Sequence, residues 1–134
     1  MEYAVGHHGE AGTAKIKMMS ANEIAEKMTQ QVIDDLPFNS GDEVAVLING
    51  LGGTPQLELY IGYRKVKQML DEREITVGCS YVGEFFTGLE MAGFSVTLMK
   101  LDDELKELLA APADTPCYKS VSYTHLTLPT TPYV

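Results

Sequence analysis

This 134-residue sequence is poor in cysteine and in basic residues, and each shortage excludes a class of protein. Its two cysteines, Cys79 and Cys117, lie 38 positions apart, which excludes a disulfide framework and a CxxC metal site. They are predicted to be free thiols in a reducing compartment. Ten basic residues against 19 acidic ones give a formal charge of −9, which argues against a nucleic-acid or anionic-membrane partner.

Long apolar runs are also missing. No stretch approaches the roughly 18 apolar residues of a membrane span. The first ten residues lack the basic and apolar regions of a signal peptide. Because 45% of the residues are apolar, a core can still be built. We therefore expect a soluble, cytoplasmic protein.

The end of the chain lacks charge altogether. Residues 120–134 contain no Asp, Glu, Lys or Arg, so all 29 charged residues lie in residues 1–119. This break in composition predicts one domain over residues 1–119 and a tail over 120–134 that is not native sequence. His125 is discounted with the tail.

The first half of the chain predicts a helix and a strand. Ser20 as N-cap and Glu23 three positions later form a capping box. Apolar residues then recur at every fourth position until Pro37 stops the helix. Residues 44–48 form a continuous apolar run, which is typical of a strand covered on both faces of a parallel sheet.

The second half continues the alternation. After a glycine-rich turn over residues 49–55, Thr54 as N-cap and Pro55 at the first helical position predict a helix that ends near residue 70. Asp102 is expected to cap a last helix. Further strands are predicted over residues 2–6, 75–81 and 94–101, with a loop over 83–93. The order predicts an α/β fold, a layered sandwich with a mixed or parallel sheet flanked by helices.

The stretch His7-His8-Gly9-Glu10 is the first candidate site. It lacks the i, i+4 spacing of a helical zinc site and has no third strong ligand nearby, so we expect no metal here. One imidazole at a strand end could instead add to a reactive carbonyl, with Gly9 allowing close approach of a small ligand. A surface loop without a function is the third interpretation, and the local pattern leaves it open.

Three other segments favour structural interpretations. The turn over residues 49–55 follows a strand, where phosphates are often bound, but neither the GxGxxG pattern nor a P-loop is present, which favours a tight turn. The loop over residues 83–93 carries two phenylalanines, which could form a binding surface but more simply fold back on the core. Asp102, Asp103 and Glu104 favour a helix cap over a metal cluster.

Together these segments resemble one family. Residues 6–12 (GHHGEAG), 49–55 (NGLGGTP) with 58–60 (ELY), and 89–95 (LEMAGFS) with 97–98 (TL) look like the C-terminal half of the substrate-binding subunit of dihydroxyacetone kinases. The resemblance covers about residues 2–119. Each motif is weak alone, whereas three in the right order are strong.

The resemblance implies a chemistry. The family's subunit binds dihydroxyacetone covalently, as a hemiaminal between a histidine Nε2 and the carbonyl carbon, for phosphorylation to dihydroxyacetone phosphate. The Gly-x-His-Gly-Glu motif assigns this catalytic role to His8 and not to His7. Gly9 and Glu10 are the further substrate-binding candidates, Glu10 by orienting His8 or its loop. Only a ketone or aldehyde can form the adduct, so polyols are rejected by chemistry.

The resemblance also implies partners. The family's N-terminal half, with a Gly-Gly-Gly-Ser-Gly-His-Glu-Pro loop and an aspartate, is not in this sequence. No cofactor is expected on this chain, while ATP or ADP with magnesium is expected on a partner L domain or subunit. The donor is either ATP or a phosphotransferase-system phosphoprotein, and the intact protein is expected to be a homodimer. We expect this chain to be a fragment that is inactive alone.

Two points stay open. Thr87-Gly88-Leu89 stands where the family usually has Thr-Ser-Leu, which removes a hydroxyl. The same fold is also used by non-catalytic co-activators that sense dihydroxyacetone, and this is the alternative function.

Overall fold

The computed structural model describes residues 1–6, 10–12, 14–89, 91–116 and 118–121. The chain divides into two units, Met1–Leu101 and Asp102–Val134. The elements of the first unit are β1 (Glu2–Tyr3), β2 (Ala14–Lys15), α1 (Ala21–Asp35), β3 (Glu43–Gly50), α2 (Gln56–Asp71), β4 (Thr76–Gly83) and β5 (Phe94–Lys100). The second unit contains α3 (Asp103–Ala110), β6 (Ala113–Asp114) and β7 (Lys119–Ser120).

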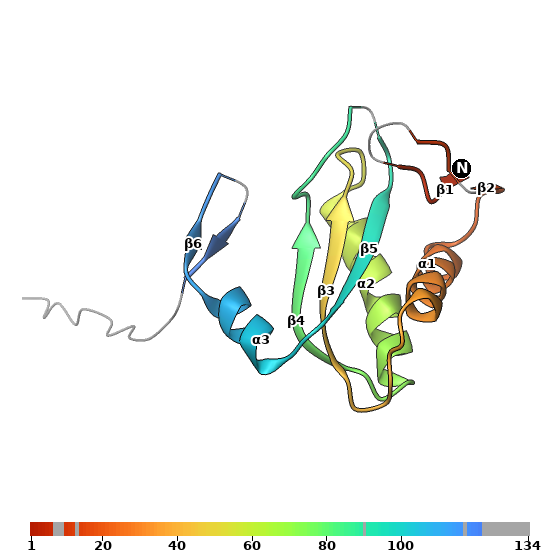
Figure 1. Ribbon diagram of the computed structural model, residues 1–134. Coiled ribbons are helices and arrows are strands. Elements are labelled where there is room, and N and C mark those ends of the chain that lie inside the picture. The colour runs from red at the N-terminus through yellow and green to blue at the C-terminus, as the bar shows by residue number, and fades with distance from the viewer. Residues whose placement is uncertain (7–9, 13, 90, 117, 122–134) are drawn as a thin grey trace, which may run out of the picture. The chain divides into compact units, whose positions relative to one another are not determined.

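A three-stranded sheet in the order β4-β3-β5 forms the centre of the first unit (Figure 1). β3 runs parallel to β4, which it reaches through α2, and antiparallel to β5. The sheet is therefore mixed, and the predicted α/β class is confirmed. β1 and β2 pair with each other as a separate two-stranded sheet.

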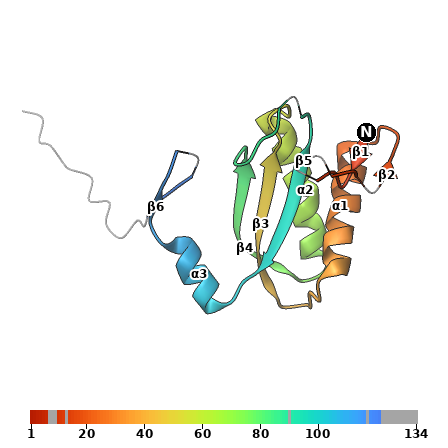
Figure 2. The ribbon, with the colours of Figure 1, turned by 45° about the horizontal axis from the view of Figure 1, so that its top comes forward.

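Helices α1 and α2 pack side by side and cover one face of the sheet (Figure 2). Val44, Val46 and Ile48 of β3 are fully buried in the same core cluster as Leu59 of α2. Burying each such side chain contributes about 1.5–3 kcal/mol. Within this unit the described helices cover one face only, so the expected cover on both faces is not found there. Leu47, on the opposite face from Val46, is half-buried.

The starts of the two helices differ in how well the sequence predicts them. The capping box of α1 is confirmed, because the Glu23 amide donates to Ser20 Oγ at 3.3 Å and the Ser20 amide donates to Glu23 Oε2 at 2.8 Å. The predicted cap of α2 is wrong. Pro55, not Thr54, is the N-cap, and it makes no side-chain cap bond. The Thr54 hydroxyl is used elsewhere, as described below.

An ion pair fastens the turn after α1 to the end of β5. Asp42 Oδ2 lies 2.8 Å from Lys100 Nζ and accepts the Asn39 amide at 2.8 Å. The Lys100 hydrogen bond, followed by that of Asn39, lowers the pKa of Asp42. A carboxyl with a lowered folded-state pKa stabilises the fold above its unfolded pKa of about 4, and this contribution is lost as the pH falls through the folded value.

We therefore expect Asp42→Asn to lower the free energy of unfolding at pH 7 and to have little effect near pH 2. Urea denaturation across this range measures the difference. Lys100→Met should remove most of the same neutral-pH contribution, because it deletes the main cause of the shift. A constant offset between Asp42→Asn and the parent chain at every pH would contradict this assignment.

The second unit begins with a capped helix. Asp102 Oδ1 accepts the Leu105 amide at 2.8 Å, which confirms the predicted cap. A short hairpin that the sequence pattern did not predict, β6 with β7, follows α3. The expected non-native tail falls outside the described residues from 122 onward and stays a prediction. No helix in the described part of the chain is both long and apolar enough to cross a membrane.

Candidate functional site

The predicted nucleophile lies between the strands of the N-terminal hairpin. His7, His8 and Gly9 are outside the described residues, whereas both flanks of the motif are described. β1 and β2 pair through Tyr3 with Ala14 and Glu2 with Lys15. The Met1 and Ile16 backbones exchange two hydrogen bonds of 2.8 and 2.9 Å beyond that pair. The hairpin thus joins the two flanks of the candidate motif by backbone pairing.

Tyr3 anchors this hairpin on α1. Its side chain is buried, and Lys27 Nζ of α1 lies 4.9 Å from the centre of its ring. Burial also raises the pKa of the Tyr3 hydroxyl. A cation over an aromatic face contributes about 0.5–2 kcal/mol. The site loop is therefore held against a helix that belongs to the main core.

Glu10 closes the site loop on its other side. The Gly6 amide donates to the Glu10 carbonyl at 3.1 Å. The Glu10 side chain also folds back over Gly6, so that a β-carbon at position 6 would overlap its carboxylate. A β-carbon at Gly12 would lie 2.5 Å from the Tyr3 carbonyl. Close packing of backbone explains why glycines flank the motif.

The turn over residues 49–55 is tied to the loop between β4 and β5. The Leu51 amide donates to the Gly93 carbonyl at 3.0 Å, and the Gly53 amide donates to the Met91 carbonyl at 2.9 Å. Gly52 has a φ of +110°, which favours glycine. Because these amides are bonded to the chain itself, they are not free to bind a phosphate. The structure supports the tight-turn interpretation.

Two buried polar side chains fasten the same loop. Asn49 Oδ1 accepts the amides of Phe85 and Phe86 at 2.9 Å each, and Asn49 Nδ2 donates to the Phe86 carbonyl at 2.8 Å. Thr54 Oγ1 accepts the Gly93 amide at 2.8 Å and donates to the Gly93 carbonyl at 2.9 Å. The sequence pattern missed both roles. A polar residue directly after an apolar strand was the only available signal for Asn49.

The expectation that the loop over residues 83–93 folds back on the core holds only in part. Phe85 is half-buried, whereas Phe86 is 57% and Leu89 is 96% exposed. Gly88, at the position of the family's usual serine, donates its amide to the Leu51 carbonyl at 3.0 Å. A β-carbon there would meet the flexible Met91 side chain at 2.5 Å. The glycine is therefore accommodated by this local packing.

Comparison with known proteins places these features in context. A model of the Dak1 domain matches residues 1–117. The dihydroxyacetone-binding subunit of PTS-dependent dihydroxyacetone kinase 2 from Listeria innocua is 41% identical over 119 residues, which are 89% of this chain and 36% of that protein. D-erythrulose kinase from Mycolicibacterium smegmatis is 42% identical over 119 residues, covering 89% of this chain and 20% of that protein.

The fold has solved counterparts as well. A structure described as a dihydroxyacetone kinase operon co-activator matches with a TM-score of 0.77 and 26% identity, over 83% of this chain and 35% of that one. The chain thus spans about a third or less of the length of these relatives.

Proposed function

Because this chain belongs to the Dak1 domain family, we propose that it carries the substrate-anchoring histidine of a dihydroxyacetone kinase. The relative from Listeria innocua supports this most strongly, since its 41% identity extends over 119 residues and its name states dihydroxyacetone binding. The substrate class is a short ketose with a free carbonyl. The erythrulose kinase relative supports a pocket that also accepts the four-carbon ketose.

The proposed chemistry is reversible addition to the carbonyl group. Nε2 of neutral His8 attacks the carbonyl carbon, and the electrons of the C=O π bond move to oxygen. The proton lost from Nδ1 is gained by that oxygen, so the hemiaminal is neutral and no other reactant is consumed. Holding the carbonyl in this way orients a hydroxyl of the substrate for phosphoryl transfer.

Glu10 is proposed as a positioning residue and Gly9 as the point of close approach to the substrate. The support is local: the Glu10 carbonyl binds the Gly6 amide at 3.1 Å, and its side chain packs over Gly6. Both contacts close the loop that contains His8.

We expect Gly6→Ala to weaken dihydroxyacetone binding about three- to tenfold, because the new methyl group displaces Glu10. The free energy of unfolding should change little, since the affected contacts lie in an exposed loop. Calorimetric titration and urea denaturation separate the two effects. Gly93→Ala is the matched control, because its methyl would meet only Leu51, at 3.4 Å. Equal loss of affinity in both variants would contradict a positioning role for Glu10.

The remaining parts of the proposed kinase come from partners. These are the N-terminal half of the substrate-binding subunit and an L domain or subunit that holds ATP or ADP with magnesium. The phosphoryl donor is ATP or a phosphotransferase-system phosphoprotein, and the PTS-dependent relative supports the second. The complete protein is proposed to be a homodimer, and this chain alone is proposed to be inactive as a kinase.

Binding selectivity tests the proposal. The chain should bind dihydroxyacetone and should not bind glycerol, which has no carbonyl carbon for His8 to attack. Equal binding of both would exclude the hemiaminal. Turnover by this chain with an L partner and donor would contradict its proposed inactivity.

The alternative is a co-activator that senses dihydroxyacetone, favoured by the structural match to such a protein with a TM-score of 0.77. Both functions predict covalent binding by His8. They differ in the next step. Transfer of phosphate to dihydroxyacetone by a protein that contains this chain and the N-terminal half would exclude the co-activator.

A further inference from the structure

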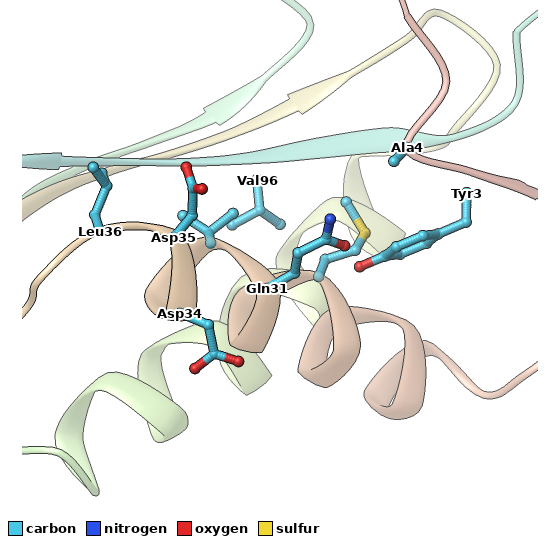
Figure 3. Close-up of a pocket in the computed structure, with 9 residues that line it drawn as sticks. Tyr3, Ala4, Gln31, Asp34, Asp35, Leu36 and Val96 are labelled. Carbon is cyan, nitrogen blue, oxygen red and sulfur yellow. The ribbon is translucent and has the colours of Figure 1, made fainter. Parts of the chain in front are cut away.

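An open groove of about 580 Å³ lies between α1 and β5 (Figure 3). Its apolar lining includes Val32 and Leu36 from the α1 side, Val96 from β5, and Tyr3 at one end. The groove is far larger than a packing defect, because native cores contain few voids larger than a water molecule. It is also separate from the loops fastened by Asn49 and Thr54, none of whose residues line it.

The groove runs beside an unpaired strand edge. β5 uses one edge to pair with β3 from Phe94 to Lys100, and no described strand pairs with its other edge. Such an edge presents a row of backbone N–H and C=O groups. An extended segment that adds to the edge would place alternate side chains into the groove, over Val96 and Val32.

The groove carries negative charge at one end. Figure 3 shows the Asp35 carboxylate directed toward β5 and the Asp34 carboxylate directed away from it. Asp35 forms no ion pair with any described residue and lies at the C-terminal end of α1, which bears the negative end of the helix dipole. Tyr3, with Lys27 over its ring, marks the opposite end. A carboxylate in this position is unfavourable for an isolated helix and favourable for a bound cation.

The geometry points to a docking site for a basic, extended segment of a partner protein, which pairs with the free edge of β5, places apolar side chains in the groove and sets a lysine or arginine against Asp35. A second copy of this chain fits less well, because each copy has a net charge of −9 and would bring Asp35 near like charge. A neutral or acidic segment lacks the complement to Asp35.

A peptide of alternating valine and threonine with two lysines at its N-terminal end tests this assignment, since antiparallel pairing with β5 places that end at Asp35. Fluorescence anisotropy with the full chain should show saturable binding, at least about tenfold tighter than for the same peptide with glutamates in place of the lysines. Replacing two threonines by proline should abolish binding, because proline removes the amide donors.

Asp35→Asn should weaken the lysine peptide about two- to fivefold, the range of an exposed ion pair. Asp71→Asn is the matched control, since Asp71 is the last residue of α2 as Asp35 is of α1, and it should leave binding unchanged. Equal binding of the lysine and glutamate peptides, or equal effects of the two substitutions, would overturn the proposal. Dimerisation of the chain that the peptide reverses would also overturn it, in favour of a second copy.

Discussion

His8→Ala is expected to lower the affinity of the chain for dihydroxyacetone at least about a hundredfold, or roughly 2.8 kcal/mol at 1.4 kcal/mol for each factor of ten. The substitution deletes the only group proposed to bond to the substrate. Calorimetric titration of dihydroxyacetone into both proteins measures the difference. The fold should be unaffected, since the described anchors of this loop are Tyr3, Gly6 and Glu10.

The neighbouring histidine provides the control. Adjacent residues of an extended chain point to opposite sides, so His7→Ala should retain most of the affinity. A larger loss in His7→Ala than in His8→Ala would show that the motif has been aligned incorrectly. Equal and small losses in both would place substrate binding elsewhere.

Asn49→Ala is expected to produce the largest loss of stability, about 2–4 kcal/mol. Asn49 is 5% exposed and satisfies two amides and one carbonyl of the Phe85–Phe86 backbone. Without its side chain these three groups lose their partners, and a buried unpaired group costs about 1–3 kcal/mol. Urea denaturation followed by circular dichroism measures the change. The exposed Asn39, whose side chain makes no hydrogen bond to a described residue, provides the control, and Asn39→Ala should cost little.

Asn49→Asp separates the donor from the acceptor. The carboxylate keeps the acceptor for the Phe85 and Phe86 amides but faces the Phe86 carbonyl with a second oxygen. Such a carboxyl has a raised folded-state pKa, so its protonated form, which can donate, is favoured at low pH. The deficit relative to the parent chain should therefore shrink as the pH falls toward 4. A deficit that does not vary with pH would contradict the donor role of Asn49 Nδ2.

The sequence predicts the local features of the fold well. The capping boxes and caps at Ser20 and Asp102 depend on residues three positions away, and both are confirmed. The α/β class follows from the order of elements. The tight turn before α2 was also favoured by the pattern, because Gly52 needs a positive φ.

The features that the sequence did not predict depend on distant partners. Thr54 looks like an N-cap, but its hydroxyl binds Gly93, which is 39 residues away. Asn49 binds a loop 36 and 37 residues away. The apolar run over residues 44–48 hides which face of the strand is covered, since Ala45 and Leu47 are as apolar as the buried valines. The site itself was inferred from the motif and its family, and His8 lies outside the described residues.

The central claim is that His8 of this chain bonds covalently to the carbonyl carbon of a short ketose. Carbon-13 NMR of the chain with dihydroxyacetone labelled at the carbonyl carbon tests it most directly. We predict a protein-bound signal in the region of tetrahedral carbon that is absent with His8→Ala and present with His7→Ala. A bound substrate whose labelled carbon stays in the ketone region, or a tetrahedral signal that survives His8→Ala, would contradict the claim.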